Sequence, residues 1–247
     1  MLPQTTTQDP LAEKYYSISP YTWCAGNPVK YVDDDGKLII FVNGLHRGDG
    51  GQSKYWEGVD YRFMDWMKDY NIRYYDGSLG GAKKVLFGSD NVKKRIEQGC
   101  IMGYSNASEI LSSLKKGETI KFLTHSMGAA YTKGFIKGLQ IYAEKNHLDI
   151  TSLIQLEVDL APYQSDEQSA NENVRTIVIS HKYDYVAGCK PMSGAENHVT
   201  RTKKSNRYNL NGEHSISSFS DEEIRRFVPE GKSSEGGDCR NWEEKFK

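Results

Sequence analysis

Short apolar segments alternate with segments of helical period along most of this sequence, and this alternation most constrains the fold. The apolar segments are rich in β-branched residues and are bounded by turn residues, which is typical of buried strands. Strands are expected in residues 37–44, 71–78, 118–125, 152–162 and 173–184, with a last short strand within 207–219. Since helices separate the strands, the sequence predicts an α/β fold whose mostly parallel sheet has helices on both faces.

The segments between these strands place apolar residues three and four positions apart, as helices with one buried face do. Phe135, Leu139 and Tyr142 have this spacing, and Ser220 followed by acidic residues predicts the start of a last helix. The expected helices are residues 55–70, 90–104, 106–117, 129–146 and 220–228, with Gly117 as the end of the third.

The composition divides the chain into three parts. Residues 1–36 contain Asp-Pro, Ser-Pro and Asn-Pro steps among aromatic residues, which predicts a short irregular arm. Residues 37–228 contain the expected strands and helices and form the predicted α/β domain. Residues 229–247 are charged and rich in glycine and serine, so a loose C-terminal tail is expected.

The charge and the hydropathy pattern exclude several classes of function. The formal net charge is −1, so no bulk field draws the protein to nucleic acid or to an acidic membrane surface. The basic run at 201–207 is typical of a solvated loop or helix face, and binding of an anionic ligand or a lipid headgroup is the alternative. No apolar run is long enough to span a membrane, and the N-terminus lacks the pattern of a secretory signal.

The cysteines give no indication of a metal site. They are widely spaced and form no C-x-x-C pair, so a zinc site is not expected, and neither a metal nor an organic cofactor is implied. A disulfide stays open, because spacing does not reveal pairing. The cysteines are Cys24, Cys100, Cys189 and Cys239.

The segment THSMG at residues 124–128 lies between an expected strand and an expected helix. A serine hydroxyl becomes a nucleophile only when it is exposed to a substrate carbonyl beside a base, and a tight strand-to-helix turn provides the exposure. The G-x-S-x-G pattern of such turns is met at Gly128, whereas Thr124 replaces the first glycine. Ser126 is therefore the candidate nucleophile, and the alternative is a loop serine without chemistry.

This segment, extended to Tyr131 as THSMGAAY, resembles the nucleophile segment of the α/β-hydrolase family of lipases and esterases. The resemblance implies an α/β-hydrolase-like fold and a Ser, acid, His order along the chain. That order makes His214 the expected base. Asp184 is the expected acid, because it follows the second strand after Ser126 and resembles the usual acid position of these hydrolases. His198 and Asp159 are the alternatives for these two roles.

Two backbone N–H groups would stabilise the developing oxyanion in such a hydrolase. The resemblance assigns one of them to Met127, which follows the nucleophile, and the other to the loop after an early strand. Leu45 is the candidate donor in that loop, and Gly44 before it gives the backbone freedom to turn. His125, next to Ser126, is expected to point away from the hydroxyl.

The segment DPLAEKYYSISPYTWCAGNPVKYVDDDGK at residues 9–37 closely resembles the end of the Rhs repeat-associated core. The resemblance implies that the following residues form a variable C-terminal toxin domain. Such a domain is delivered from a bacterial cell during competition and has a cognate immunity protein. Asp34 replaces a proline of the family motif, which leaves self-cleavage between Asp33 and Leu38 open.

Together these features predict a serine hydrolase that cleaves a carboxylic ester without a cofactor. The resemblance to the Rhs family favours a lipid or phospholipid ester as the substrate. Two alternatives stay open: an esterase, thioesterase or amidase for a small molecule, and a non-catalytic binding module on the same fold. Export is expected as part of an Rhs-type protein, since this chain has no signal peptide.

Overall fold

The computed structural model describes residues 38–46, 50–78, 91–114, 118–200 and 212–231. Several sequence predictions therefore lie outside the described residues. They are the irregular arm at 1–36, the Rhs-like segment at 9–37, the basic run at 201–207, the helix end at Gly117, the cysteines Cys24 and Cys239, and all but the first three residues of the tail.

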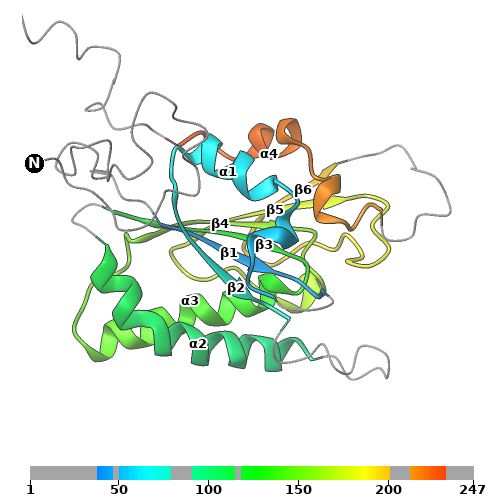
Figure 1. Ribbon diagram of the computed structural model, residues 1–247. Coiled ribbons are helices and arrows are strands. Elements are labelled where there is room, and N and C mark those ends of the chain that lie inside the picture. Colours follow the sequence, from blue (N-terminus) through cyan, green and yellow to red (C-terminus); the bar gives the residue numbers. More distant parts are fainter. Residues whose placement is uncertain (1–37, 47–49, 79–90, 115–117, 201–211, 232–247) are drawn as a thin grey trace, which may run out of the picture. The chain divides into compact units, whose positions relative to one another are not determined.

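The described strands form one six-stranded sheet in which every neighbouring pair is parallel (Figure 1). Their order is β2-β1-β3-β4-β5-β6, so the chain adds β2 on one side of β1 and the later strands on the other. The strands are β1 (Leu38–Asn43), β2 (Asn71–Asp76), β3 (Ile120–His125), β4 (Ile154–Leu160), β5 (Arg175–His181) and β6 (Glu196–Thr200). Ligand sites in such sheets gather at the carboxyl ends of the strands, where this order reverses.

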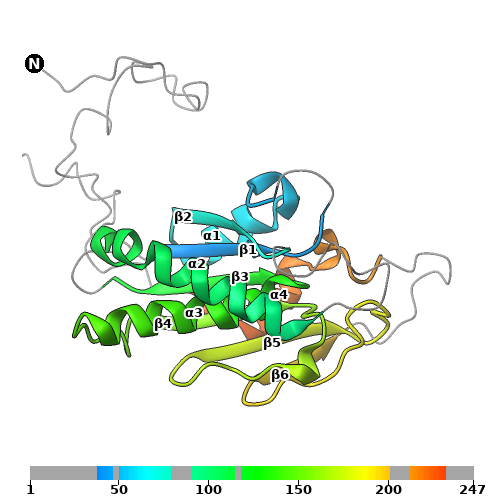
Figure 2. The same cartoon turned by 90° about the horizontal axis from the view of Figure 1, so that it is seen from below.

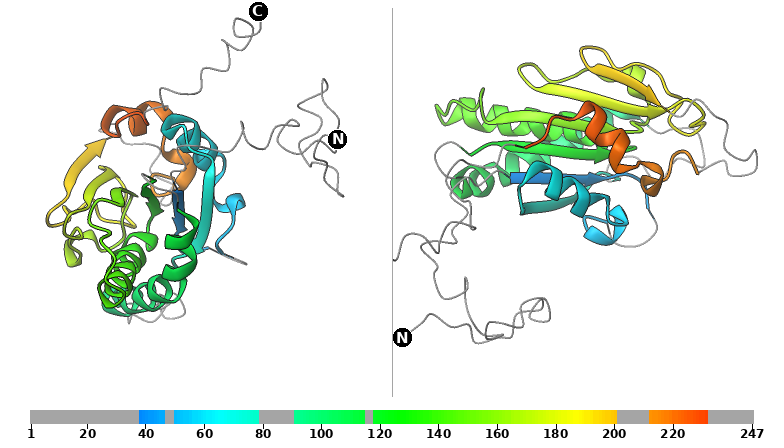
Figure 3. Two further views of the ribbon diagram at one scale, coloured as in Figure 1. Left: turned by 90° about the vertical axis from the view of Figure 1, so that its left-hand side faces the viewer. Right: turned by 90° about the horizontal axis from the view of Figure 1, so that it is seen from above.

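Helices cover both faces of the sheet, as the views in Figures 1 and 3 show. The helices α2 and α3 lie on one face, and α1 and α4 lie on the other. The described α-helices are α1 (Val59–Met67), α2 (Val92–Ser113), α3 (Gly128–Lys145) and α4 (Asp221–Phe227). The predicted α/β-hydrolase-like fold class is confirmed by this arrangement. No helix of the described residues is long and apolar enough to cross a membrane.

Alternate residues of β1 enter two separate cores, as the two-residue period of a strand requires. Leu38, Ile40 and Val42 pack with α2 and α3. Ile39 and Phe41 pack on the opposite face with α1 and α4. A strand buried on both faces gives a continuous apolar run, which is why this strand is recognisable in the sequence.

The helices α2 and α3 lie side by side on their face of the sheet (Figure 2), with glycines at the contact. A Cβ at Gly99 would lie 1.9 Å from the carbonyl oxygen of Tyr131, and one at Gly134 would lie 1.8 Å from that of Ile96. Only glycine fits at these two positions, so the two backbones approach closely. The contact holds α3, whose first turn follows Ser126.

The sequence predicts two helical pieces at 90–104 and 106–117, but the structure has one continuous helix, α2. The side-chain amide of Asn106, at the predicted break, donates to the carbonyl of Met102 at 2.9 Å. This bond satisfies a polar side chain that would otherwise favour a turn, so the helix continues.

The opposite error occurs at 55–70, where the sequence predicts one helix and the structure has two elements. A 3-10 helix, η3 (Ser53–Trp56), precedes α1. Between them, Glu57 and Gly58 have φ values of 49° and 87°. This left-handed backbone ends one helix before the next begins.

The last short strand and loop predicted within 207–219 are described only in part, because residues 207–211 lie outside the described residues. Residues 212–219 contain no strand and form turns and a 3-10 helix, η6 (Ile216–Ser218). The last described strand is instead β6, which contains a glutamate, an asparagine and a histidine and lies at the sheet edge. A polar edge strand has no apolar run to reveal it. The predicted final helix is confirmed as α4, with Ser220 as its N-cap.

Candidate active site

The segment at 124–128 forms a tight turn between β3 and α3. Ser126 has a left-handed backbone with φ of 56°, which is uncommon outside glycine and is concentrated at functional sites. The Ser126 N–H donates to the carbonyl of Leu160 at 3.0 Å, and the N–H of Tyr163 donates to the Ser126 carbonyl at 3.1 Å. A Cβ at Gly128 would lie 2.3 Å from the carbonyl oxygen of Val42, so the second glycine of the motif is required by close packing.

Thr124, which stands where the first glycine of the motif is expected, has its own buried partner. Its hydroxyl donates to Asp159 Oδ1 at 2.5 Å, and Lys133 Nζ lies 2.9 Å from Asp159 Oδ2 and 2.7 Å from Glu157. We call Thr124, Lys133, Glu157 and Asp159 the buried cluster. Thr124 and Lys133 engage both carboxylate oxygens of Asp159. Asp159, the alternative acid, is therefore bonded inside this cluster, and the carboxylate bonded to His214 is that of Asp184.

The charges of the buried cluster compensate one another. Burial alone would lower the pKa of Lys133, but the carboxylates of Asp159 and Glu157 raise it above its ordinary value. Burial, together with the charge of Asp159, raises the pKa of Glu157 to about 8. At neutral pH Lys133 is therefore an ammonium and the Glu157 carboxyl is mostly protonated.

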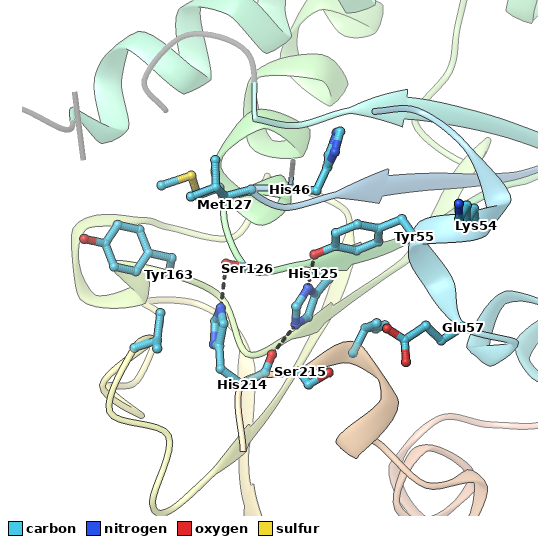
Figure 4. Close-up of a pocket in the computed structure, with 13 residues that line it drawn as sticks. His46, Lys54, Tyr55, Glu57, His125, Ser126, Met127, Tyr163, His214 and Ser215 are labelled. Atoms are coloured by element: carbon cyan, nitrogen blue, oxygen red, sulfur yellow. Dashed lines mark hydrogen bonds between the residues drawn. The ribbon is translucent and has the colours of Figure 1, made fainter. Parts of the chain in front are cut away.

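Ser126, His214 and Asp184, far apart in the chain, meet at the carboxyl edge of the sheet. His214 Nε2 lies 2.8 Å from Ser126 Oγ (Figure 4), and His214 Nδ1 lies 2.7 Å from Asp184 Oδ2. A carboxylate only accepts, so Nδ1 carries the proton of the neutral imidazole and Nε2 accepts from the hydroxyl. We call these three residues the candidate triad.

Asp184 is held by its own loop as well as by the imidazole. The backbone N–H groups of Val186 and Ala187 both donate to Asp184 Oδ1 at 2.9 Å. Burial would raise the pKa of the Asp184 carboxyl, but the hydrogen bond and charge of His214 and these N–H donors hold it below its ordinary value. The carboxylate is therefore ionised and oriented toward the imidazole.

The alternative base, His198, lies away from the serine. It is on β6, and its ring stacks on Phe227 with the ring centroids 4.0 Å apart. His181 is fully buried and its Nδ1 lies 2.8 Å from the carbonyl oxygen of Glu213. Of these two imidazoles, neither lines the cavity at Ser126.

The two predicted oxyanion donors lie beside the candidate triad. Gly44 packs directly on the nucleophile turn, because a Cβ there would lie 2.6 Å from Ser126 Cβ. Leu45, the next residue, is 46% exposed and lines the cavity. Met127 is the N-cap residue of α3, where backbone N–H groups are not used by the helix. The structure thus brings both predicted donors to the same cavity as the serine.

A cavity of about 670 Å³ opens over the serine. The sequence predicted only some of the residues that line this cavity, because they come from several loops and from η3, which are far apart in the chain. Figure 4 shows these side chains around the hydroxyl. The lining consists of Leu45, His46, Lys54, Tyr55, Glu57, His125, Ser126, Met127, Tyr163, Val186, His214, Ser215 and Ile216.

Sequence reasoning expected His125 to point away from the Ser126 hydroxyl, as it does, but gave neither His125 nor Asn43 a part in organising this site. His125 has its ring hydrogen-bonded to Tyr55 and to the backbone carbonyl of His214 rather than to the Ser126 hydroxyl. Asn43, at the end of β1, donates to the Gly44 carbonyl at 2.8 Å and accepts from the loop that follows. The Asn-Gly pair in the sequence indicates a turn, but not these contacts.

Among the described residues, no group of three or more His, Cys, Asp and Glu side chains is arranged to hold a metal ion. Cys100 and Cys189 are both free thiols. The chemistry of the site therefore has to be argued from the side chains and backbone groups around Ser126.

The sequence matches no model of a known protein family and no curated protein. Similar solved structures include an uncharacterised protein from Bacillus cereus (18% identity, 64% of this chain, TM-score 0.36). Two others are YbtT, a type II thioesterase of the yersiniabactin pathway (10%, 79%, 0.36), and a metagenomic carboxyl esterase (16%, 81%, 0.25). The chain spans 47% of the first and third proteins and 94% of the thioesterase.

Proposed function

We propose that this protein is a serine hydrolase that cleaves a carboxylic ester through an acyl-Ser126 intermediate. One observation carries the proposal: the Ser126 hydroxyl is hydrogen-bonded to His214, whose other ring nitrogen is bonded to the Asp184 carboxylate. Both distances are within the reach of a nucleophile and its general base. The left-handed backbone of Ser126 exposes the hydroxyl to the cavity.

In this mechanism Ser126 Oγ attacks the ester carbonyl while His214 Nε2 takes its proton. The Asp184 carboxylate stabilises the imidazolium that forms, and the N–H groups of Leu45 and Met127 donate to the oxyanion. The bond from the carbonyl carbon to the leaving alcohol then breaks, and His214 returns the proton to the alcohol. Water, deprotonated by the same imidazole, releases the acid and regenerates the hydroxyl.

We propose a lipid ester, phospholipids included, as the substrate. The side chains of Leu45, Met127, Val186 and Ile216 give the cavity an apolar wall beside the serine. Such a wall suits an acyl chain, and the volume is in the range of small-molecule sites. The lysine and the glutamate among the residues that line the cavity are Lys54 of η3 and Glu57, the residue after it, and Figure 4 shows both on the far side of His125 from Ser126.

The biological setting is a proposal that depends on the resemblance of residues 9–37 to the Rhs core. In it, the hydrolase is the variable C-terminal effector of an Rhs-type protein, delivered into a competing bacterium and neutralised by an immunity partner. Expression of the full chain in a bacterial host tests this directly. Growth arrest by the wild type that disappears in Ser126→Ala supports the toxin role. Unimpaired growth of cells that contain active enzyme, whether it is directed to the cytoplasm or to the periplasm, contradicts it.

A fluorophosphonate probe tests the catalytic proposal. Wild-type protein is expected to carry the label on Ser126, and Ser126→Ala and His214→Ala, checked for folding by circular dichroism, are expected to remain unlabelled. A folded wild type without label would leave a non-catalytic binding module as the explanation. Fatty-acid release from phospholipid vesicles, compared with hydrolysis of short p-nitrophenyl esters and of acyl thioesters, then separates the lipase from the small-molecule alternatives.

A further inference from the structure

A chain of hydrogen bonds lies beside Ser126 and His214 and ends in two different loops (Figure 4). The backbone N–H of Gly44 donates to Tyr55 Oη at 3.1 Å, and Tyr55 Oη is hydrogen-bonded to His125 Nδ1. His125 Nε2 is hydrogen-bonded to the backbone carbonyl of His214 at 2.8 Å. The chain therefore joins the loop of Leu45 to the loop of the candidate base.

The direction of each hydrogen bond in this chain follows from the groups involved. The carbonyl of His214 only accepts, so His125 Nε2 carries a proton. Burial, with the neighbouring His214, lowers the pKa of His125 to about 3, so the ring is neutral and Nδ1 is a bare acceptor. Burial raises the pKa of Tyr55, so its hydroxyl keeps the proton that it donates to Nδ1.

We propose that Tyr55 and His125 are positioning residues that fix the candidate base relative to the oxyanion donors. The inference rests on the proposed function of the candidate triad. One end of the chain is Gly44, which packs on Ser126 and precedes Leu45. The other end is the backbone carbonyl of His214 itself. One uncharged chain of hydrogen bonds therefore positions both the loop of the oxyanion donor Leu45 and the base, which act on the same substrate carbonyl.

Neither positioning residue hydrogen-bonds the Ser126 hydroxyl; each acts through the group it holds. His125 is 4% exposed and its ring lies 5.1 Å from the ring of His214, centroid to centroid. Base and oxyanion donors stabilise the transition state more than bound substrate. Loss of the chain is therefore expected to lower kcat with little change in KM, whereas loss of a substrate-binding side chain would raise KM.

The test compares Tyr55→Phe with Tyr74→Phe in the full chain. Both changes remove a hydroxyl from a tyrosine near η3, and the Tyr74 hydroxyl bonds Asp60 at 2.7 Å instead of a group of the site. Tyr55→Phe is expected to lower kcat on p-nitrophenyl acetate, and the rate of fluorophosphonate labelling, by about 10-fold, with KM within about twofold. Tyr74→Phe is expected to change neither kinetic quantity.

A second pair of variants keeps the test decisive if Tyr55→Phe is poorly folded. His125→Gln retains an N–H that reaches the His214 carbonyl, and His125→Leu does not, so faster labelling of folded His125→Gln is expected. Equal labelling of Tyr55→Phe and wild type, or of the two His125 variants, would overturn the positioning role alone. A wild type that is not labelled on Ser126 would overturn the proposed function, and this inference with it.

Discussion

Asp159 and Asp184 are both buried aspartates at the carboxyl side of neighbouring strands, yet their surroundings give them different roles. Asp159 is the penultimate residue of β4 and faces α3, where Lys133 and Thr124 occupy both of its oxygens. Asp184 lies three residues beyond β5, where two backbone N–H groups hold one oxygen and His214 takes the other. Asp159, inside a strand, is therefore bonded to other buried side chains, whereas Asp184, in the loop after a strand, orients the imidazole of His214.

The buried cluster and the candidate triad therefore lie on either side of the same turn and differ in kind. The cluster contains a lysine and two carboxyl groups that no substrate reaches, since all three side chains are 4% exposed or less. The triad opens to the cavity through Ser126 and His214. The comparison predicts that changes in the cluster affect stability, whereas changes in the triad affect catalysis.

The largest expected difference is between Asp184→Asn and Asp159→Asn. Asp184→Asn is expected to lower kcat by about 10⁴-fold with little change in folding, because the imidazole loses its orienting carboxylate. Asp159→Asn is expected to retain kcat within about 10-fold and to lower the free energy of unfolding by about 1–3 kcal/mol. Ester hydrolysis and urea denaturation measure the two effects. A folded Asp159→Asn with the larger loss of kcat would reverse the comparison.

Lys133→Met probes the stability side of the comparison. Removal of the ammonium leaves Glu157 and Asp159 buried without their cation, so the free energy of unfolding is expected to fall by about 3–5 kcal/mol. The matched control is Lys137→Met on the exposed side of α3, which is expected to change stability by about 0.5 kcal/mol or less. Equal midpoints of urea denaturation for the two variants would show that the cluster contributes no stability.

The pH dependence of stability gives a smaller effect from the same cluster. The pKa of Glu157 is raised in the folded protein from an ordinary value of 4.5 to about 8. The contribution of Glu157 to the free energy of unfolding is therefore fully present below pH 4.5 and is lost as the pH rises through about 8. Glu157→Gln, which cannot ionise, is expected to show less loss of stability between these values. Parallel stability curves for wild type and variant across this range would contradict the raised pKa.

The fold could be predicted from sequence where local patterns carry the signal. Strands buried on both faces, such as β1 and β3, give apolar runs, and the small residues after Ser126 indicate a strand-to-helix turn. The edge strand β6 could not be predicted, because most of its residues are polar and it therefore contains no apolar run. The break before α1 depends on the left-handed backbone of Glu57, which no apolar period reveals.

The candidate site could be predicted only in part, because its contacts join distant segments. The family resemblance favoured Asp184, which follows the second strand after Ser126, over Asp159, but the partner of each carboxylate is what distinguishes them. The contact between Tyr55 and His125 spans 70 positions in the chain, so local sequence holds no trace of it. The roles of Ser126 and its partners stay predictions that depend on the geometry described above.

The most direct test of the central claim is a crystal structure of the full chain after treatment with a fluorophosphonate. The account predicts a phosphonyl group bonded to Ser126 Oγ, with its oxygen within about 3 Å of the N–H groups of Leu45 and Met127. His214 Nε2 is expected beside the same phosphorus centre. A serine that stays unmodified in crystals of the folded protein, or an adduct whose oxygen points away from both N–H groups, would contradict it.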